Sequence, residues 1–221
     1  MKTILIFGAS SVHGVGGEHG GWADKLKASF HHEMYGGEAR GENSTVYELG
    51  VPGTTLSDME SRFIAEVEAR TVHSKPEDII IVFSAGTNDS RAIDAIDNHL
   101  SSPDDFAASV HSFIHLAKDY AAHILGVGLC PVDESKTSPK QSPTQMTSSY
   151  FSNGRIKSFE EALRRTCDEE GVPFVPLFDQ APANWAESYV FIDGLHPNDR
   201  GHEWIRSQVE PELRNILEPG A

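Results

Sequence analysis

Hydrophobic residues gather in five short runs along the chain. These runs are Ile4–Phe7, Val46–Leu49, Ile79–Phe83, Ile124–Leu129 and Phe174–Phe178. Three of them are nearly continuous in aliphatic and β-branched residues, as is typical of strands buried on both faces of a sheet. The pattern therefore predicts five short strands in the interior of the protein.

Helical patterns lie between these runs. The segment Ser102–Asp105 combines an N-capping serine, a proline at the first helical position and acids at the positive end of the helix. The apolar residues that follow have helical spacing, so a helix is predicted over Ser102–Ala122. A second apolar stripe ends at Cys167, which gives that thiol a core role. A last helix is expected from about Pro197, with Pro211 kinking or restarting it.

Strands that alternate with helices predict βαβ crossovers and hence a parallel sheet. We expect an α/β fold, a three-layer doubly wound (flavodoxin-like) sheet of about five parallel strands with helices on both faces, in a single domain over residues 1–221. One long loop, at about residues 131–149, is rich in Ser, Thr, Pro and Lys. It follows the fourth strand, at the edge of the sheet where such folds bind ligands, and is either a lid or a disordered excursion.

Composition narrows the class of partner. The chain has 33 Asp and Glu against 18 Lys and Arg, a net charge of −15, which argues against nucleic acid and against an anionic membrane surface. Cys130 and Cys167 cannot form a disulfide framework, and we expect free thiols in a reducing compartment. No signal peptide or membrane-spanning run is recognisable, so the expected location is cytoplasmic, without integral membrane association.

Small-residue turns follow the first three predicted strands. The first, Gly8–Gly17, lacks the glycine spacing of a dinucleotide fingerprint and the lysine of a P-loop, which leaves a serine at the tip of the strand. In the second turn, Gly53 follows a proline and is either an ordinary turn glycine or a backbone N–H available to an oxyanion. In the third, Asn88 either forms a local Asx-turn or aims its amide into the cleft.

An aspartate and a histidine stand three residues apart near the C-terminal end, in Asp193-Gly194-Leu195-His196-Pro197. Pro197 restricts His196 to an extended conformation and opens the final helix. The carboxylate of Asp193 is then close enough to accept the Nδ1–H of the imidazole, which leaves Nε2 free as a base. The alternative is a helix-capping aspartate beside an exposed histidine.

Together, these turns resemble the blocks of the SGNH hydrolases, also called the GDSL esterase/lipase family. The matching pieces occur in the family's order and span nearly the whole chain: Gly8-Ala9-Ser10, Gly53, Gly86-Thr87-Asn88-Asp89 and Asp193-Gly194-Leu195-His196-Pro197. The resemblance implies a catalytic triad in which Ser10 is the nucleophile, His196 the base and Asp193 the orienting acid. It implies an oxyanion hole formed by the backbone N–H groups of Ser10 and Gly53 and the side-chain amide of Asn88.

The first block departs from the family pattern. The family reads Gly-Asp-Ser, and here Ala9 stands in place of the aspartate. That acid is not a member of the triad, but its loss leaves both Ser10 and Ser11 as candidates for the nucleophile. Ser10 is favoured because the family pattern has a glycine four residues after the nucleophile, where Gly14 stands.

The function implied by this resemblance is a serine esterase that acts through an acyl-enzyme, with a small-molecule ester as substrate and no cofactor or metal. Small or medium acyl esters are expected, with acetylated carbohydrates, lysophospholipids and thioesters all open. One alternative is a catalytically idle α/β binding module. Another is a metal-dependent hydrolase that uses Asp193, His196 and His202.

One further pair of side chains has a spacing that can hold a metal. His111 and His115 are four residues apart on the predicted helix, on the face opposite its apolar stripe. The sequence offers no acid as a third ligand beside them, so we expect a solvated helix face.

Overall fold

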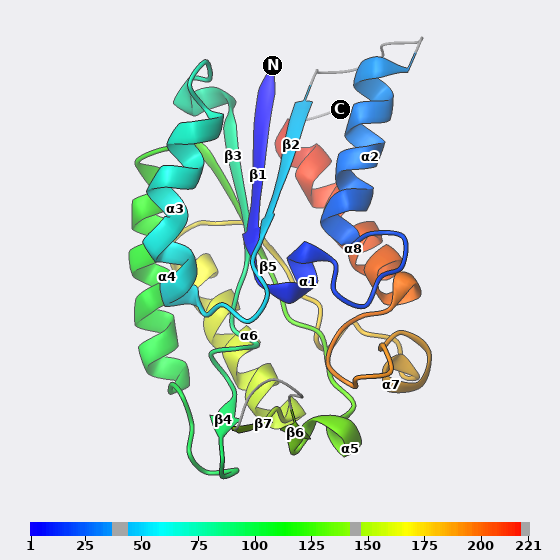
Figure 1. Ribbon diagram of the computed structural model, residues 1–221. Helices are drawn as coiled ribbons and strands as arrows, with labels where there is room; N and C mark the ends of the chain where they lie inside the picture. The colour runs from blue at the N-terminus through cyan, green and yellow to red at the C-terminus, as the bar shows by residue number, and fades with distance from the viewer. Residues whose placement is uncertain (37–43, 142–146, 218–221) are drawn as a thin grey trace.

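The structure is a computed structural model that describes residues 1–36, 44–141 and 147–217. At its centre lies a five-stranded parallel sheet in the order β2-β1-β3-β5-β8 (Figure 1). The strands are β1 (Lys2–Gly8), β2 (Ser44–Gly50), β3 (Ile79–Ser84), β5 (His123–Val127) and β8 (Phe174–Val175). This is the doubly wound order of the flavodoxin-like fold, and it confirms the predicted fold class.

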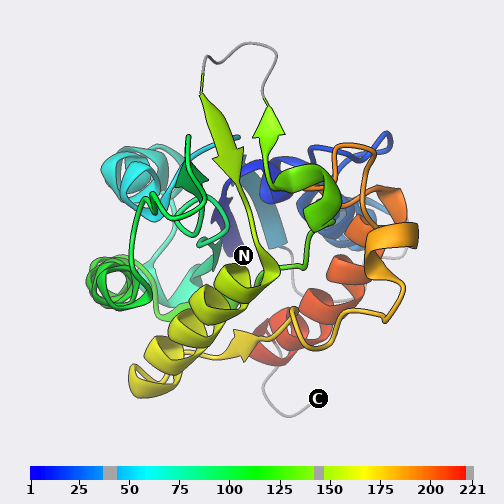
Figure 2. The same ribbon diagram turned by 90° about the horizontal axis from the view of Figure 1, so that it is seen from below.

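Helices cover both faces of this sheet (Figures 1 and 2). One face carries α3 (Leu56–Arg70), α4 (Pro103–Lys118) and α6 (Asn153–Glu169). The other face carries α2 (Trp22–Tyr35) and α8 (Asp199–Leu217).

The hydrophobic core is divided between these two faces. In β1, Leu5 and Phe7 pack in the cluster on the α3–α4–α6 side, whereas Ile4 and Ile6 pack in the cluster on the α2–α8 side. All four side chains are 0% exposed, which explains why the strand is apolar at each position from Ile4 to Phe7.

The predicted helix signals are confirmed at α4 and α6. The hydroxyl of Ser102 accepts a hydrogen bond from the backbone N–H of Asp105, and Pro103 begins α4. Cys167 is buried on α6, and burial raises the pKa of its thiol to about 12. The final helix begins two residues later than expected, at Asp199, and it runs through Pro211 without restarting.

The fourth and fifth strands end earlier than their apolar runs predicted. The reason is the buried carboxylate of Glu160 on α6, which accepts hydrogen bonds from the backbone N–H groups of Leu129, Leu177 and Phe178. These groups would continue the pairing of β5 with β8, and they donate to a side chain instead. Glu160 therefore separates the two strands just where they reach the carboxyl edge of the sheet.

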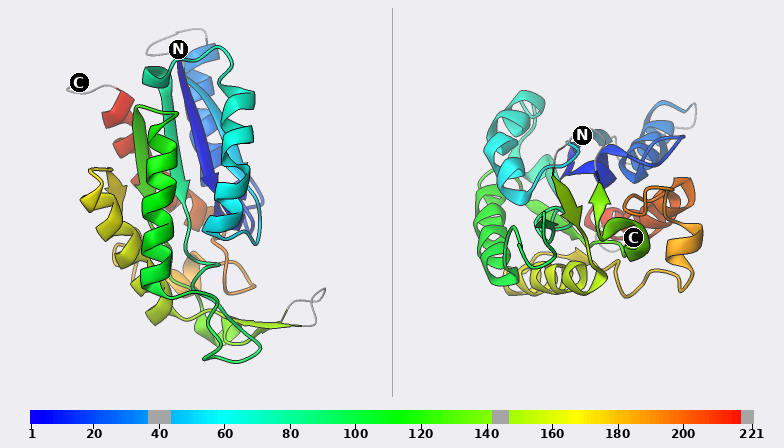
Figure 3. Two further views of the ribbon diagram at one scale, coloured as in Figure 1. Left: turned by 90° about the vertical axis from the view of Figure 1, so that its left-hand side faces the viewer. Right: turned by 60° about the horizontal axis from the view of Figure 1, so that its bottom comes forward.

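The long loop at residues 131–149 contains regular structure that its composition did not indicate. It holds α5 (Glu134–Thr137), β6 (Lys140–Gln141) and the start of β7 (Ser148–Tyr150), while residues 142–146 lie outside the described part. The strand β4 (Ala92–Ile93) joins β7 and β6 in a small antiparallel sheet. Figure 3 shows this sheet beyond the carboxyl ends of the central strands.

Three further elements complete the described chain. They are the single-turn helix α1 (Ser10–His13), the 3₁₀ turn η1 (Pro76–Asp78) and the single-turn helix α7 (Trp185–Ser188).

Candidate active site

Ser10 lies at the tip of β1, where it begins α1. Its backbone N–H is in the first turn of this helix, where amide groups have no partner within the helix. The turn is tight, because a Cβ at Gly8 would lie 2.3 Å from a methyl of Val12 and 2.9 Å from the carbonyl oxygen of Ser84. Arg62 on α3 stabilises the ends of β1 and β2 by donating hydrogen bonds to the carbonyl oxygens of Gly8 and Leu49.

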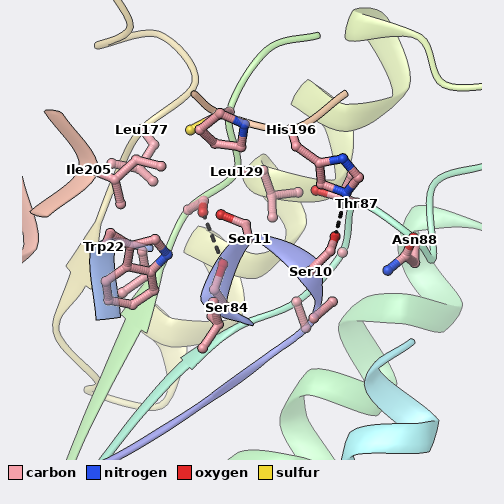
Figure 4. A pocket seen from close by; sticks show the side chains of 18 of the residues that line it. Ser10, Ser11, Trp22, Ser84, Thr87, Asn88, Leu129, Leu177, His196 and Ile205 are labelled. Atoms are coloured by element: carbon pink, nitrogen blue, oxygen red, sulfur yellow. Dashed lines mark hydrogen bonds between the residues drawn. The ribbon is translucent and has the colours of Figure 1, made fainter. Parts of the chain in front are cut away.

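Ser10, His196 and Asp193 form one continuous chain of hydrogen bonds. The Oγ of Ser10 lies 2.9 Å from Nε2 of His196 (Figure 4). Nδ1 of the same ring lies 2.6 Å from Oδ2 of Asp193. The contact with a carboxylate fixes Nδ1 as the protonated nitrogen, so Nε2 accepts the proton of the hydroxyl. This arrangement is the one that the spacing of Asp193 and His196 predicted.

The carboxylate of Asp193 is held from several sides. Its Oδ1 accepts hydrogen bonds from the backbone N–H groups of Leu195, at 3.0 Å, and His196, at 3.1 Å. Burial on its own raises the pKa of Asp193, but the hydrogen bonds and the charge of His196 outweigh it and hold that pKa well below its usual range. The acid therefore stays ionised at neutral pH.

A lysine that the sequence reasoning missed also contacts this acid. The Nζ of Lys140, on β6, lies 3.1 Å from Oδ2 of Asp193 and donates to the backbone oxygen of the same residue at 2.9 Å. The lysine comes from the long loop, 53 residues away in sequence. Its only sequence signal was the presence of lysines in a loop expected at the ligand-binding edge.

The described part of the long loop is docked against the turn that carries Asp193. The backbone N–H of Asp133 donates to the carbonyl oxygen of Gly194 at 2.8 Å, and the indole N–H of Trp185 donates to that of Pro131 at 2.8 Å. Gly194 has a φ of +78°, and a Cβ there would lie 2.5 Å from the Cβ of Lys136. Glycine is thus required both by the backbone conformation and by the close approach of the loop.

Asn88 lies in the same cavity as Ser10, and its side chain is fixed by one hydrogen bond. Its Nδ2 donates to the carbonyl oxygen of Thr54 at 2.9 Å, which leaves a second amide proton available. The neighbouring Asp89 accepts a hydrogen bond from the backbone N–H of Leu56 at 3.1 Å. These two contacts join the turn after β3 to the turn after β2.

Gly53 is placed differently from the other predicted residues. It has a φ of +82°, and a Cβ there would meet no atom within 4 Å, so the backbone conformation and not lack of room explains the glycine. Thr54 lines the cavity beside Ser10, whereas Gly53 is exposed on the same turn and does not line it. The structure thus gathers Ser10, Asn88 and His196 at the cavity and leaves Gly53 at its margin.

A cavity of about 60 Å³ opens beside Ser10 at the carboxyl edge of the sheet. Figure 4 shows Ser10 and His196 on one side of it and Trp22, Leu177 and Ile205 on the other. The apolar side chains come from the core layer formed by α2 and α8. The hydroxyls of Ser11 and Ser84 also line the space, so the cavity is apolar at its far side and polar near its centre.

His202 does not join Asp193 and His196 as the sequence alternative of a metal centre requires. It is 0% exposed, its Nδ1 lies 3.3 Å from the backbone nitrogen of Trp22, and its Nε2 lies 3.1 Å from the carbonyl oxygen of Val15. Burial lowers its pKa. Both ring nitrogens therefore hold the turn after Ser10 against the last helix.

A known protein family matches most of the chain. The model of the GDSL-like Lipase/Acylhydrolase family matches residues 6–204, so the chain belongs to this family of ester hydrolases. No curated protein sequence matches the chain. In the described residues, no helix is both long enough and apolar enough to span a bilayer.

Solved structures share the fold at low sequence identity. A lipase/acylhydrolase from Enterococcus faecalis is 18% identical with a TM-score of 0.69, and the match covers 100% of both chains. A member of the lipolytic protein G-D-S-L family from Veillonella parvula is 18% identical with a TM-score of 0.68, over 97% of this chain and 99% of that one. An acetyl xylan esterase from Geobacillus stearothermophilus is 16% identical with a TM-score of 0.64, over 98% of this chain and 95% of that one.

Proposed function

We propose that the protein is a serine esterase that hydrolyses carboxylic esters through an acyl-enzyme, with Ser10 as nucleophile, His196 as base and Asp193 as orienting acid. The observation that carries this proposal is the hydrogen-bonded chain from Ser10 through His196 to Asp193. In this order, the hydroxyl is poised to lose its proton to a base whose other nitrogen is fixed by a carboxylate.

The reaction begins when Oγ of Ser10 attacks the ester carbonyl while His196 takes its proton. The carbonyl oxygen becomes an oxyanion, which the backbone N–H of Ser10 and the free amide proton of Asn88 stabilise. The backbone N–H of Gly53 is a further donor, from the margin of the cavity. His196 then protonates the departing alcohol, and the acyl group stays on Ser10. Water, deprotonated by the same imidazole, releases the acid and restores the enzyme.

The size of the cavity favours a short acyl chain. The cavity beside Ser10 is small, about 60 Å³, and Trp22 and Ile205 line its far side. Acetyl and other short acyl groups fit, with their carbon chain directed from Ser10 toward Trp22 and Ile205. The likeness in fold to an acetyl xylan esterase is consistent with this preference.

The proposed chemistry accommodates Ala9, which stands where the family has an aspartate. Ala9 removes a polar side chain next to the nucleophile, but the triad acid is Asp193, so the proposed chemistry needs no acid at position 9.

We also propose one domain over residues 1–221, because the strands of a single sheet extend from Lys2 to Val175 and α8 packs against it.

Replacing each serine of the first turn in separate variants tests the proposal. Ser10→Ala should lower kcat for p-nitrophenyl acetate by about 10⁴-fold or more, because the nucleophile is lost while binding remains. Ser11→Ala is the matched control, since it keeps the contact between Ser10 and His196. Loss of activity in Ser11→Ala with full activity in Ser10→Ala would contradict the assignment.

A series of esters from acetate to decanoate tests the acyl preference, and a maximum at decanoate would overturn it.

A further inference from the structure

A second group of histidines and a carboxylate lies on the outer surface of the α4–α6 layer. The Nε2 of His111 is 2.9 Å from Oε1 of Glu170, and the Nε2 of His115 is 3.2 Å from the same oxygen. The two imidazole rings are stacked with their centroids 4.4 Å apart. One atom from each of the three side chains lies within 4.8 Å of the other two.

The third member of this cluster corrects the expectation of a solvated pair without an acid. Glu170 follows the last turn of α6, and the packing of α6 against α4 brings it to the histidines across 55 residues of sequence. The cluster lies toward the C-terminal ends of both helices. In a βαβ unit the helix runs antiparallel to its strands, so these ends lie at the sheet edge opposite the cavity of Ser10.

We propose that His111, His115 and Glu170 bind a divalent transition-metal ion of the Zn²⁺ class. Two imidazole nitrogens and one carboxylate oxygen are the donor set that suits Zn²⁺, Co²⁺, Ni²⁺ and Cu²⁺, whereas Mg²⁺ and Ca²⁺ prefer oxygen alone. Metal–ligand bonds of about 2.0–2.2 Å in a tetrahedral arrangement set neighbouring donor atoms roughly 3.3–3.6 Å apart. The spacings from Glu170 Oε1 to the histidines, 2.9 and 3.2 Å, need only side-chain adjustments to reach that range.

The carboxylate of Glu170 is oriented by a lysine that leaves one oxygen for the ion. The Nζ of Lys118 lies 2.6 Å from Oε2 and 3.1 Å from the backbone oxygen of Glu170. The hydrogen bond from Lys118 is the largest cause that holds the pKa of Glu170 below its usual value. The second carboxylate oxygen, Oε1, is the atom that both histidines face.

Another surface group offers a weaker set of donors. Glu18, His19 and Asp199 also lie within 4.8 Å of one another, but they contain a single imidazole. Asp199 is already engaged by both the backbone N–H and the ring of His19. Transition metals favour imidazole ligands, so the pair on α4 should bind first. A variant in one of these two groups therefore serves as a control for zinc binding at the other.

Calorimetric titration of the full chain with ZnCl₂ tests this site. The parent should bind one equivalent of zinc at the strongest site, and His115→Ala should abolish that binding. Glu170→Gln should weaken it by about ten-fold or more. The control variants His73→Ala and His19→Ala should bind as the parent does, because both leave the α4–α6 cluster intact.

A second readout separates binding at this cluster from binding elsewhere. An ion that joins α4 to α6 stabilises only the folded state, so zinc should raise the melting temperature of the parent and not that of His115→Ala. Mg²⁺ at the same concentration should have no such effect. Three results would each overturn the proposal. They are parent-like zinc affinity in both His115→Ala and Glu170→Gln, loss of zinc binding in His19→Ala, and no zinc binding by the parent.

Discussion

The site of Ser10 and the α4–α6 cluster both place histidine nitrogens within hydrogen-bonding distance of a carboxylate. At the carboxyl edge of the sheet, His196 lies 2.6 Å from Asp193, and on the α4–α6 surface His111 and His115 lie 2.9 and 3.2 Å from Glu170. The chemical groups are alike, yet the surroundings differ. The side chain of His196 is 14% exposed, whereas those of His111 and His115 are 55% and 58% exposed.

The two clusters differ in the partners of their imidazole nitrogens. His196 has Asp193 at Nδ1 and the hydroxyl of Ser10 at Nε2, so the ring can take the proton of the hydroxyl at Nε2 while the carboxylate holds it in place at Nδ1. In the surface cluster, two Nε2 atoms converge on one oxygen, and no hydroxyl faces them among the contacts of the described residues. The first arrangement suits general base catalysis, and the second suits an ion that accepts several lone pairs.

The same chemical change in the two clusters should give the largest contrast. Asp193→Asn removes the acceptor that fixes the tautomer of His196, and kcat for p-nitrophenyl acetate should fall by about 10⁴-fold. Glu170→Gln, assayed with a chelator present, should leave kcat within about two-fold, as a surface substitution remote from the cavity. Equal losses in the two variants would remove the distinction between the clusters.

A smaller effect is expected at the oxyanion hole. Asn88→Ala removes one donor to the developing oxyanion but leaves Ser10, His196 and Asp193 in place, so kcat should fall by about 10²–10³-fold. KM should change little, because the lost interaction strengthens in the transition state. Steady-state kinetics on p-nitrophenyl acetate separates the two parameters. An effect confined to KM would assign Asn88 to substrate binding and contradict the proposed role.

The smallest effect should come from the lysine beside the triad acid. The positive charge of Lys140 opposes protonation of the nearby imidazole, so Lys140→Met should shift the acid limb of the kcat/KM profile to higher pH, by up to about one unit. The pKa of Asp193 lies well below its usual range, so its carboxylate stays ionised through this limb, in which activity is lost as pH falls. The rate above pH 8 should change only a few-fold.

Two variants control this experiment. Lys140→Arg should restore the position of the acid limb, because it restores the charge. Lys136→Met removes a lysine of the same loop that pairs with Asp133 instead of the triad, and its pH profile should match the parent. An unshifted profile in Lys140→Met would show that the lysine has only a structural role.

Local patterns in the sequence were sufficient for the framework and for the contact between Asp193 and His196. The stretches of β1 and β3 that are buried on both faces are continuously apolar, so their runs were visible. The three-residue spacing of Asp193 and His196 before Pro197 fixed the contact between them. Each of these features depends on residues close in sequence. The turn after β1 was equally local, and it placed Ser10 at the strand tip.

Contacts between remote segments escaped the same reasoning. Lys140 reaches Asp193 across 53 residues, and Glu170 reaches His115 across 55, and neither pairing leaves a periodic signal. Glu160 ends two strands early by accepting their backbone N–H groups, which hydrophobicity alone cannot foretell. Gly53 was visible in the sequence, but its position was not. A glycine is favoured there by a positive φ, in open surroundings and not in a crowded site.

Covalent labelling with a fluorophosphonate, followed by peptide mapping, tests the central claim most directly. The reagent reacts with a serine activated by a neighbouring base, so we expect one label per chain, on Ser10. The label should be absent from Ser10→Ala and present in Ser11→Ala. Labelling of Ser11 in the parent, or no labelling of a folded protein that still hydrolyses p-nitrophenyl acetate, would contradict the assignment of Ser10 as the nucleophile.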